Sequence, residues 1–125
     1  MSDRPVVLQQ GDNGARAEMR VQVSWLGQLM TKDGRQLAVK VVDISRSGAG
    51  VSGEDKIRRL SEVELRVNVP ILPDLDEHQM LQIRATVVYQ RLSDGAWRSG
   101  LQFVEPTPEQ QALLKTWLVK RSQFW

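Results

Sequence analysis

Two short groups of polar residues carry the side chains best suited to chemistry in this sequence. The first is RAEMR, with Arg16 and Arg20 four residues apart, and the second is DISRSG, with Asp43, Ser45 and Gly48. Arginine can bind phosphate or the O6 and N7 edge of guanine with two hydrogen bonds, and can stack on a purine. A carboxylate accepts hydrogen bonds from guanine N1 and N2, Ser45 adds a hydroxyl, and Gly48 lets the backbone pass close to a ligand. These groups predict a site that binds guanine and phosphate together.

A β-hairpin is predicted to bring the two groups together. VQVSWLGQLM (21–30) and RQLAVKVVDI (35–44) both contain the apolar and polar alternation of strands, and TKDG between them favours a turn. A tight turn pairs residues whose numbers sum to about 66 or 67, which sets Arg20 opposite residues 45–47. Both polar groups are therefore expected at one rim of the same sheet.

Further segments of the same kind predict four more strands. They are AGVSG (49–53), VELRVNV (63–69), MLQIRATVVYQRL (80–92) and AWRSGLQFV (96–104). Short turns between six strands indicate a mainly β protein with a closed or nearly closed antiparallel barrel.

The last segment, TPEQQALLKTWLVKRSQFW, predicts a helix that covers the barrel. Thr107 is the expected N-cap, Pro108 the first helical residue and Gln110 its partner in a capping box. An apolar stripe with helical spacing follows at Leu114, Trp117, Leu118 and Arg121. Trp25 and Trp117 are expected in the core.

Length and composition limit the classes of protein that fit. A chain of 125 residues suits one domain, and 41% hydrophobic with 26% charged residues is typical of a globular protein. The net charge of +2 is too small to indicate a duplex nucleic acid. Cysteine is absent, and no apolar run reaches the roughly 18 residues of a membrane span, so we expect a cytoplasmic protein. We expect a flexible arm at 1–12 and one domain at 13–125.

The motifs resemble those of the PilZ domain family, which binds the bacterial second messenger cyclic di-GMP. RAEMR is similar to RxxxR, DISRSG to DxSxxG, and GLQF, from Gly100 to Phe103, to the family's GxxF ending. The resemblance covers about residues 13 to 121 and implies a six-stranded barrel with a C-terminal helix. It further implies that Arg16 and Arg20 hold guanine and phosphate, while Asp43 and Ser45 bind a guanine edge.

The resemblance also implies that the arm folds over the nucleotide and that a downstream protein or a fused domain reads the result. Ala15 stands where some relatives carry an arginine, which leaves open whether the site takes one ligand molecule or a stacked pair. Arg46, Arg91 and Arg98 are candidates for further cationic contacts, and Arg98 belongs to our predicted site. Tyr89 is a candidate for stacking on a base.

Other functions fit the sequence less well. No Ser, His and Asp arrangement, phosphate-binding glycine loop or metal cluster is visible, and His78 is the only histidine, so we expect neither an enzyme nor a cofactor. The main alternative is a PilZ-like adaptor that contacts proteins and binds nucleotide weakly or not at all. A barrel that binds single-stranded nucleic acid, stacking bases on Tyr89 and Trp97, is disfavoured by Asp43.

Overall fold

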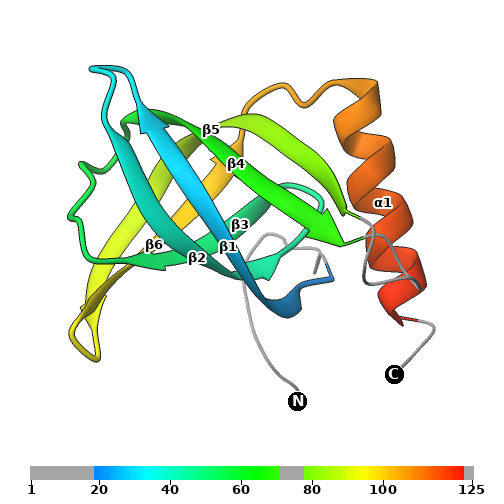
Figure 1. The fold of residues 1–125 in the computed structure, drawn as a ribbon, viewed down its shortest axis with the longest axis horizontal. Coiled ribbons are helices and arrows are strands. Elements are labelled where there is room, and N and C mark those ends of the chain that lie inside the picture. The colour runs from blue at the N-terminus through cyan, green and yellow to red at the C-terminus, as the bar shows by residue number, and fades with distance from the viewer. Residues whose placement is uncertain (1–18, 71–77, 123–125) are drawn as a thin grey trace, which may run out of the picture.

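Six antiparallel strands close into a barrel, and one helix follows the last strand (Figure 1). The computed structural model describes residues 19–70 and 78–122, so the expected arm at 1–12 lies outside the described residues and its boundary stays a prediction. The elements are β1 (Val21–Thr31), β2 (Gln36–Ile44), β3 (Gly48–Gly53), β4 (Glu62–Pro70), β5 (His78–Ser93), β6 (Ala96–Phe103) and α1 (Pro108–Ser122). Around the barrel the strands follow the order β1, β2, β3, β6, β5, β4. The predicted fold class is confirmed.

The β1–β2 hairpin has the predicted register over most of its length. Leu29 pairs with Leu37 and Trp25 with Val41, so the residue numbers sum to 66 as expected. A bulge between Gln22 and Trp25 then shifts the sum to 65. Because of this shift the last pair is Val21 with Ile44, and the chain before β1 meets the end of β2.

The core fills the inside of the barrel, as the alternation in the strands requires. Leu29, Leu65 and Ile83 form a row across β1, β4 and β5, and each is at most 1% exposed. Burying a side chain of this size contributes about 1.5–3 kcal/mol. Strand pairs of this kind stabilise the barrel, and the polar residues lie on its outer face.

Helix α1 begins with the predicted capping box and lies beside the barrel (Figure 1). The backbone N–H of Gln110 donates to the Thr107 hydroxyl at 3.1 Å, and the Thr107 N–H donates to the Gln110 side chain at 2.8 Å. Leu114, Trp117 and Leu118 are buried, as predicted. The Trp117 ring packs edge-on against Trp25 with a centroid distance of 4.9 Å, which fixes the helix on the sheet. Within the described residues, no helix has the length and apolar character that crossing a membrane requires.

Candidate functional site

Asp43 lies between two arginines that come from distant parts of the chain. Arg20 Nη1 donates to Asp43 Oδ1 at 2.6 Å, and Arg98 Nη2 donates to Oδ2 at 3.0 Å. The backbone N–H of Gly50 donates to Oδ1 as well, at 3.0 Å. The Asp43 side chain is only 16% exposed, whereas Arg20 is 56% and Arg98 31% exposed. The arrangement holds two guanidinium groups at the surface around one largely buried carboxylate.

Glycines on β3 and β6 make room for this arrangement. Asp43 pairs with Gly50, Gly50 with Gly100 and Gly100 with Tyr89, which forms one row across β2, β3, β6 and β5. A Cβ at Gly50 would lie 2.7 Å from Asp43 Oδ2, and a Cβ at Gly100 would lie 2.1 Å from the Tyr89 ring. The two side chains therefore lie across the glycines. Both glycines are buried, Gly50 under the carboxylate of Asp43 and Gly100 under the ring of Tyr89.

Ser45 and Gly48 form the turn that ends β2. The Ser45 hydroxyl is fully buried; it donates to the Gly48 carbonyl and accepts from the Gly48 N–H, both at 3.2 Å. A Cβ at Gly48 would lie 2.2 Å from the Leu101 carbonyl oxygen, so β6 itself requires a glycine there. The turn that the sequence indicates is present. The described contacts of both residues stabilise this turn and the strand after it.

Comparison with known proteins identifies the family. Residues 14–120 match the PilZ domain. The chain belongs to the PilZ domain family. No sequence among the curated proteins compared with it matches the chain.

Solved structures share the barrel at low sequence identity. The Bacillus subtilis inhibitor of motility (MotI/DgrA) has a TM-score of 0.74 and 16% identity, covering 89% of this chain and 53% of that one. YcgR from Escherichia coli in complex with c-di-GMP has a TM-score of 0.72 and 14% identity, covering 86% and 46%. The PilZ domain of Escherichia coli YcgR with c-di-GMP has a TM-score of 0.69 and 15% identity, covering 88% and 93%. The chain thus spans about half the length of MotI/DgrA and of full YcgR.

The PilZ domain brings together most of the residues that the sequence indicated. Arg20, Asp43 and Arg98 are in direct contact, and Ser45 and Gly48 form the adjoining turn. Arg16 and the expected arm lie outside the described residues. The contact between Asp43 and Arg98 joins residues 55 positions apart, and it depends on β3, which pairs with β2 on one side and with β6 on the other.

A row of cations lies next to Asp43. The sequence did not indicate that these residues form a row. Lys40 pairs with Ser52, Ser52 with Arg98 and Arg98 with Arg91, so Lys40, Arg98 and Arg91 lie on one line across four strands. Outward positions of adjacent strands share one face, which was the available signal, but the order of the strands was needed to use it. These three cations, Arg20 and one carboxylate leave a local charge of +3.

The remaining candidates lie elsewhere or have other partners. Arg46 is exposed near the turn. The Trp97 ring has the ammonium of Lys56 5.3 Å from its centroid, and Trp97 pairs with Leu92, whereas Tyr89 pairs with Gly100. Side chains an odd number of positions apart in β6 face opposite sides, so Tyr89 and Trp97 do not form one stacking surface. In residues 19–70 and 78–122, no group of three or more metal-binding side chains occurs.

Proposed function

We propose that this PilZ domain is a cyclic di-GMP receptor that couples binding of the second messenger to a contact with a partner protein or a fused domain. The single observation that carries this proposal is the contact of Asp43 with both Arg20 and Arg98, with the carboxylate packed over the buried Gly50. Family membership supports it, as do neighbours of the same fold solved with c-di-GMP, namely YcgR and MrkH. Because a second messenger acts inside the cell, the proposal places the domain in the cytoplasm.

The site offers groups of both kinds that cyclic di-GMP requires. The ligand has two phosphates, each with one negative charge, and two guanines. Arg16, Arg20 and Arg98 would bind phosphate or the O6 and N7 edge of guanine, where a guanidinium forms two hydrogen bonds. Asp43 would accept from guanine N1 and N2. In this proposal Ser45 and Gly48 act mainly by holding the turn that carries Asp43.

Arg20 is expected to change partner when the ligand binds. An ionised carboxylate has about four acceptor positions, and Arg20, Arg98 and Gly50 use three of those of Asp43. A guanine edge that donates from N1 and N2 needs two, so one of the present donors must leave. Arg20 is the most exposed of them and leads directly into the chain before β1. Its transfer from Asp43 to the ligand would link binding to the position of residues 1–18.

A receptor fits these groups better than an enzyme does. Asp43 is engaged by two cations and a backbone N–H, so it is held as an acceptor and not as a free base. The adaptor with weak or no nucleotide binding is the second candidate, since Asp43 already has two cationic partners and a backbone N–H within the protein. We propose no nucleic-acid polymer as a partner because the two candidate aromatic rings do not share a surface.

Titration calorimetry tests the proposal. Cyclic di-GMP is titrated into the wild type and into the variants Asp43→Asn, Arg98→Ala and Arg20→Ala. GTP and cyclic di-AMP are titrated as control ligands that test selectivity. Arg59→Ala is the matched control, because Arg59 is an exposed arginine outside the site. We expect selective binding by the wild type and the control, and a loss of at least about tenfold in each site variant. No heat at about 100 μM ligand, with the fold intact, would favour the adaptor.

A further inference from the structure

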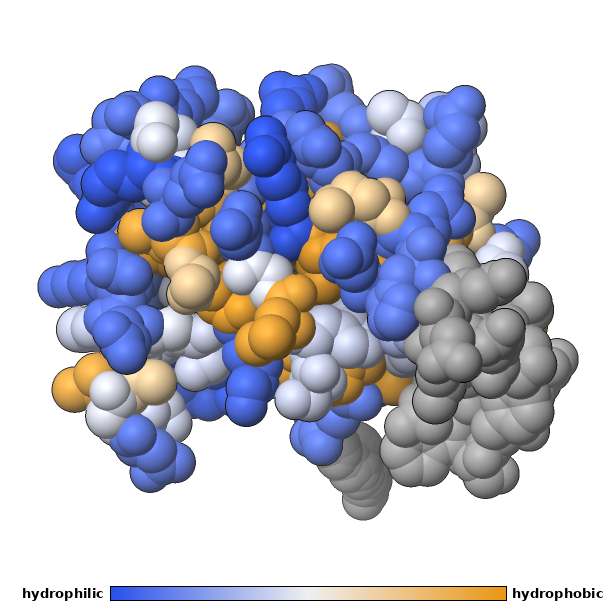
Figure 2. All heavy atoms as spheres, in the orientation of Figure 1, coloured by the Kyte–Doolittle hydropathy of each residue, from blue (hydrophilic) through white to orange (hydrophobic). Residues whose placement is uncertain are grey.

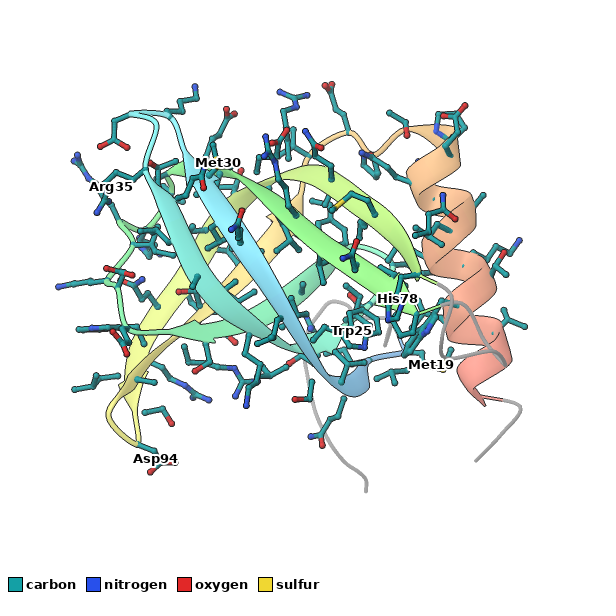
Figure 3. All side chains as sticks on the ribbon, in the orientation of Figure 1. Met19, Trp25, Met30, Arg35, His78 and Asp94 are labelled. Carbon is teal, nitrogen blue, oxygen red and sulfur yellow. The ribbon has the colours of Figure 1, made fainter. Side chains whose placement is uncertain are left out.

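A second concave surface lies at the end of the barrel opposite Asp43. A hollow of about 550 Å³ is formed by the β1–β2 turn and the connection from β3 to β4, and its lining includes Thr31, Lys32, Arg35, Ile57, Arg58 and Leu60. Figure 3 shows Arg35 and Met30 at this end of the barrel, away from Trp25 and α1. At the left of Figure 2, which is the same end, apolar surface is exposed between hydrophilic side chains.

Leu60 is held in an unfavourable conformation with its side chain in solvent. Its φ is 70°, in the left-handed region that a branched apolar residue seldom adopts, and it is 66% exposed. The backbone is fixed there, because the Leu60 N–H donates to the Val87 carbonyl at 2.7 Å and the Val87 N–H donates to the Ser61 carbonyl at 3.0 Å. A glycine would satisfy this backbone with less strain. Strained backbone of this kind clusters at functional sites, and burial in the core does not account for this exposed side chain.

The charges around the hollow leave one arginine open. Lys32 pairs with Glu62 at 3.2 Å, so both are engaged. Asp33 is 3.6 Å from Arg35 and also accepts from the Thr31 hydroxyl, which lowers the pKa of this carboxyl. The Arg58 side chain has no partner within the described part of the chain, while its carbonyl accepts from Ser61 and fixes the local backbone. The unmatched charge in the hollow is therefore positive.

The hollow continues along the outside of the barrel. A second hollow of about 240 Å³ shares Thr31, Lys32 and Glu62 with the first and is also lined by Met30, Val63, Glu64 and Arg84. The two added charges are matched, because Glu64 pairs with Arg66 and Arg84 with Glu105. Ile57, 4% exposed, provides an apolar floor in the first hollow. An elongated surface with apolar patches and one open cation suits an extended peptide better than a compact small molecule.

We propose that this surface binds a short segment of a partner protein in which an apolar side chain contacts Leu60 and Ile57 and a neighbouring carboxylate pairs with Arg58. The assignment of this segment to the downstream partner rests on the proposed function, whereas the binding surface itself does not need the nucleotide. The proposal extends that function by specifying the partner segment as an extended peptide with an apolar residue and a neighbouring acidic residue.

Selection of peptides on the full 125-residue chain tests the surface. A phage-displayed random-peptide library is selected on the wild type and counter-selected on the double variant Leu60→Gly/Arg58→Glu. Enriched peptides are synthesised and titrated by fluorescence anisotropy against the wild type, both single variants and Arg59→Glu. Arg59 is the matched control, since it is an exposed neighbour that does not line the hollow. Leu60→Gly removes the side chain and relieves strain, so its melting temperature should equal or exceed that of the wild type.

We expect enriched peptides that combine an apolar residue with Asp or Glu. They should bind Leu60→Gly and Arg58→Glu at least about tenfold more weakly, and Arg59→Glu within about threefold. A lysine in place of the peptide's acidic residue should restore binding to Arg58→Glu. Peptides that bind the double variant as well as the wild type, or no enrichment at all, would overturn the proposal.

The two proposals can fail separately. Calorimetry with cyclic di-GMP on the double variant should give wild-type affinity, because the hollow and Asp43 lie at opposite ends of β2. Peptide binding without any nucleotide binding would support the peptide-binding surface and refute the proposed cyclic di-GMP receptor. Nucleotide binding without any selected peptide would support the receptor and overturn the peptide-binding surface.

Discussion

Replacing Asp43 by asparagine tests the energetic arrangement of the site. Asparagine keeps an oxygen for the Gly50 N–H but places an amide NH₂ opposite Arg98, which also donates. The bond to Arg98 is partly buried and charge-assisted, which is worth about 1.5–3 kcal/mol. The bond to Arg20 is discounted to about 0.2–1 kcal/mol, because the Arg20 side chain is 56% exposed. We expect Asp43→Asn to lower the free energy of unfolding by about 2–3 kcal/mol.

Urea unfolding followed by tryptophan fluorescence measures this loss, and calorimetry should show a melting temperature lower by roughly 6–15 °C. Glu105→Gln is the matched control, since Glu105 pairs with Arg84 at 3.4 Å but is 85% exposed, and it should cost less than about 1 kcal/mol. The two arginines that contact Asp43 differ in exposure, because Arg98 is 31% and Arg20 56% exposed. Arg98→Ala should therefore lower the free energy of unfolding more than Arg20→Ala does. An Asp43→Asn variant within about 0.5 kcal/mol of the wild type, or the reverse order of the two arginine variants, would refute the reasoning.

Three further predictions follow from the described contacts. Gly48→Ala should destabilise the fold by about 1–3 kcal/mol in urea, because its Cβ would meet the Leu101 carbonyl oxygen; wild-type stability would show that β3 can move away from β6. Thr107→Ala should cost about 1 kcal/mol by loss of the helix cap on Gln110, and an unchanged urea midpoint would mean that α1 is held by packing alone. Tyr89→Ala should weaken cyclic di-GMP binding by about 1–3 kcal/mol while Tyr89→Phe leaves the affinity in place, if the exposed ring stacks on a base; equal affinities of all three proteins in calorimetry would exclude stacking.

Local signals in the sequence predicted local structure well. The capping box of Thr107 and Gln110 needs only four residues, and it is present as predicted. The hairpin register was correct up to Trp25, and the bulge beyond it moved the pairing by one residue. The meeting of Arg20 with Asp43 survived this shift, because a sum of 65 sets Arg20 opposite Ser45 and a long arginine side chain reaches the carboxylate two positions along β2.

Contacts that depend on the exact register of paired strands could not be read from the sequence. Tyr89 lies over Gly100 because β5 pairs with β6 in a register that contains a bulge. Gly50 is required by the side chain of Asp43, a neighbour on another strand, and nothing in its own surroundings in the sequence indicates this. Ser45 illustrates the opposite case: its motif was recognised, but only the structure shows that the hydroxyl is fully buried within the turn.

The pairing of β3 with β6 joins segments about fifty residues apart, and this seam lies under the Asp43 site. Pairs with such wide sequence separation are slow to form, because the loop entropy is lost before the contacts are gained. A growing chain could form the β1–β2 hairpin on the ribosome long before Arg98 has been synthesised. The proposed receptor would therefore be silent until the barrel has closed, so that only finished molecules could respond to the signal, and bound nucleotide would in turn oppose reopening of the seam.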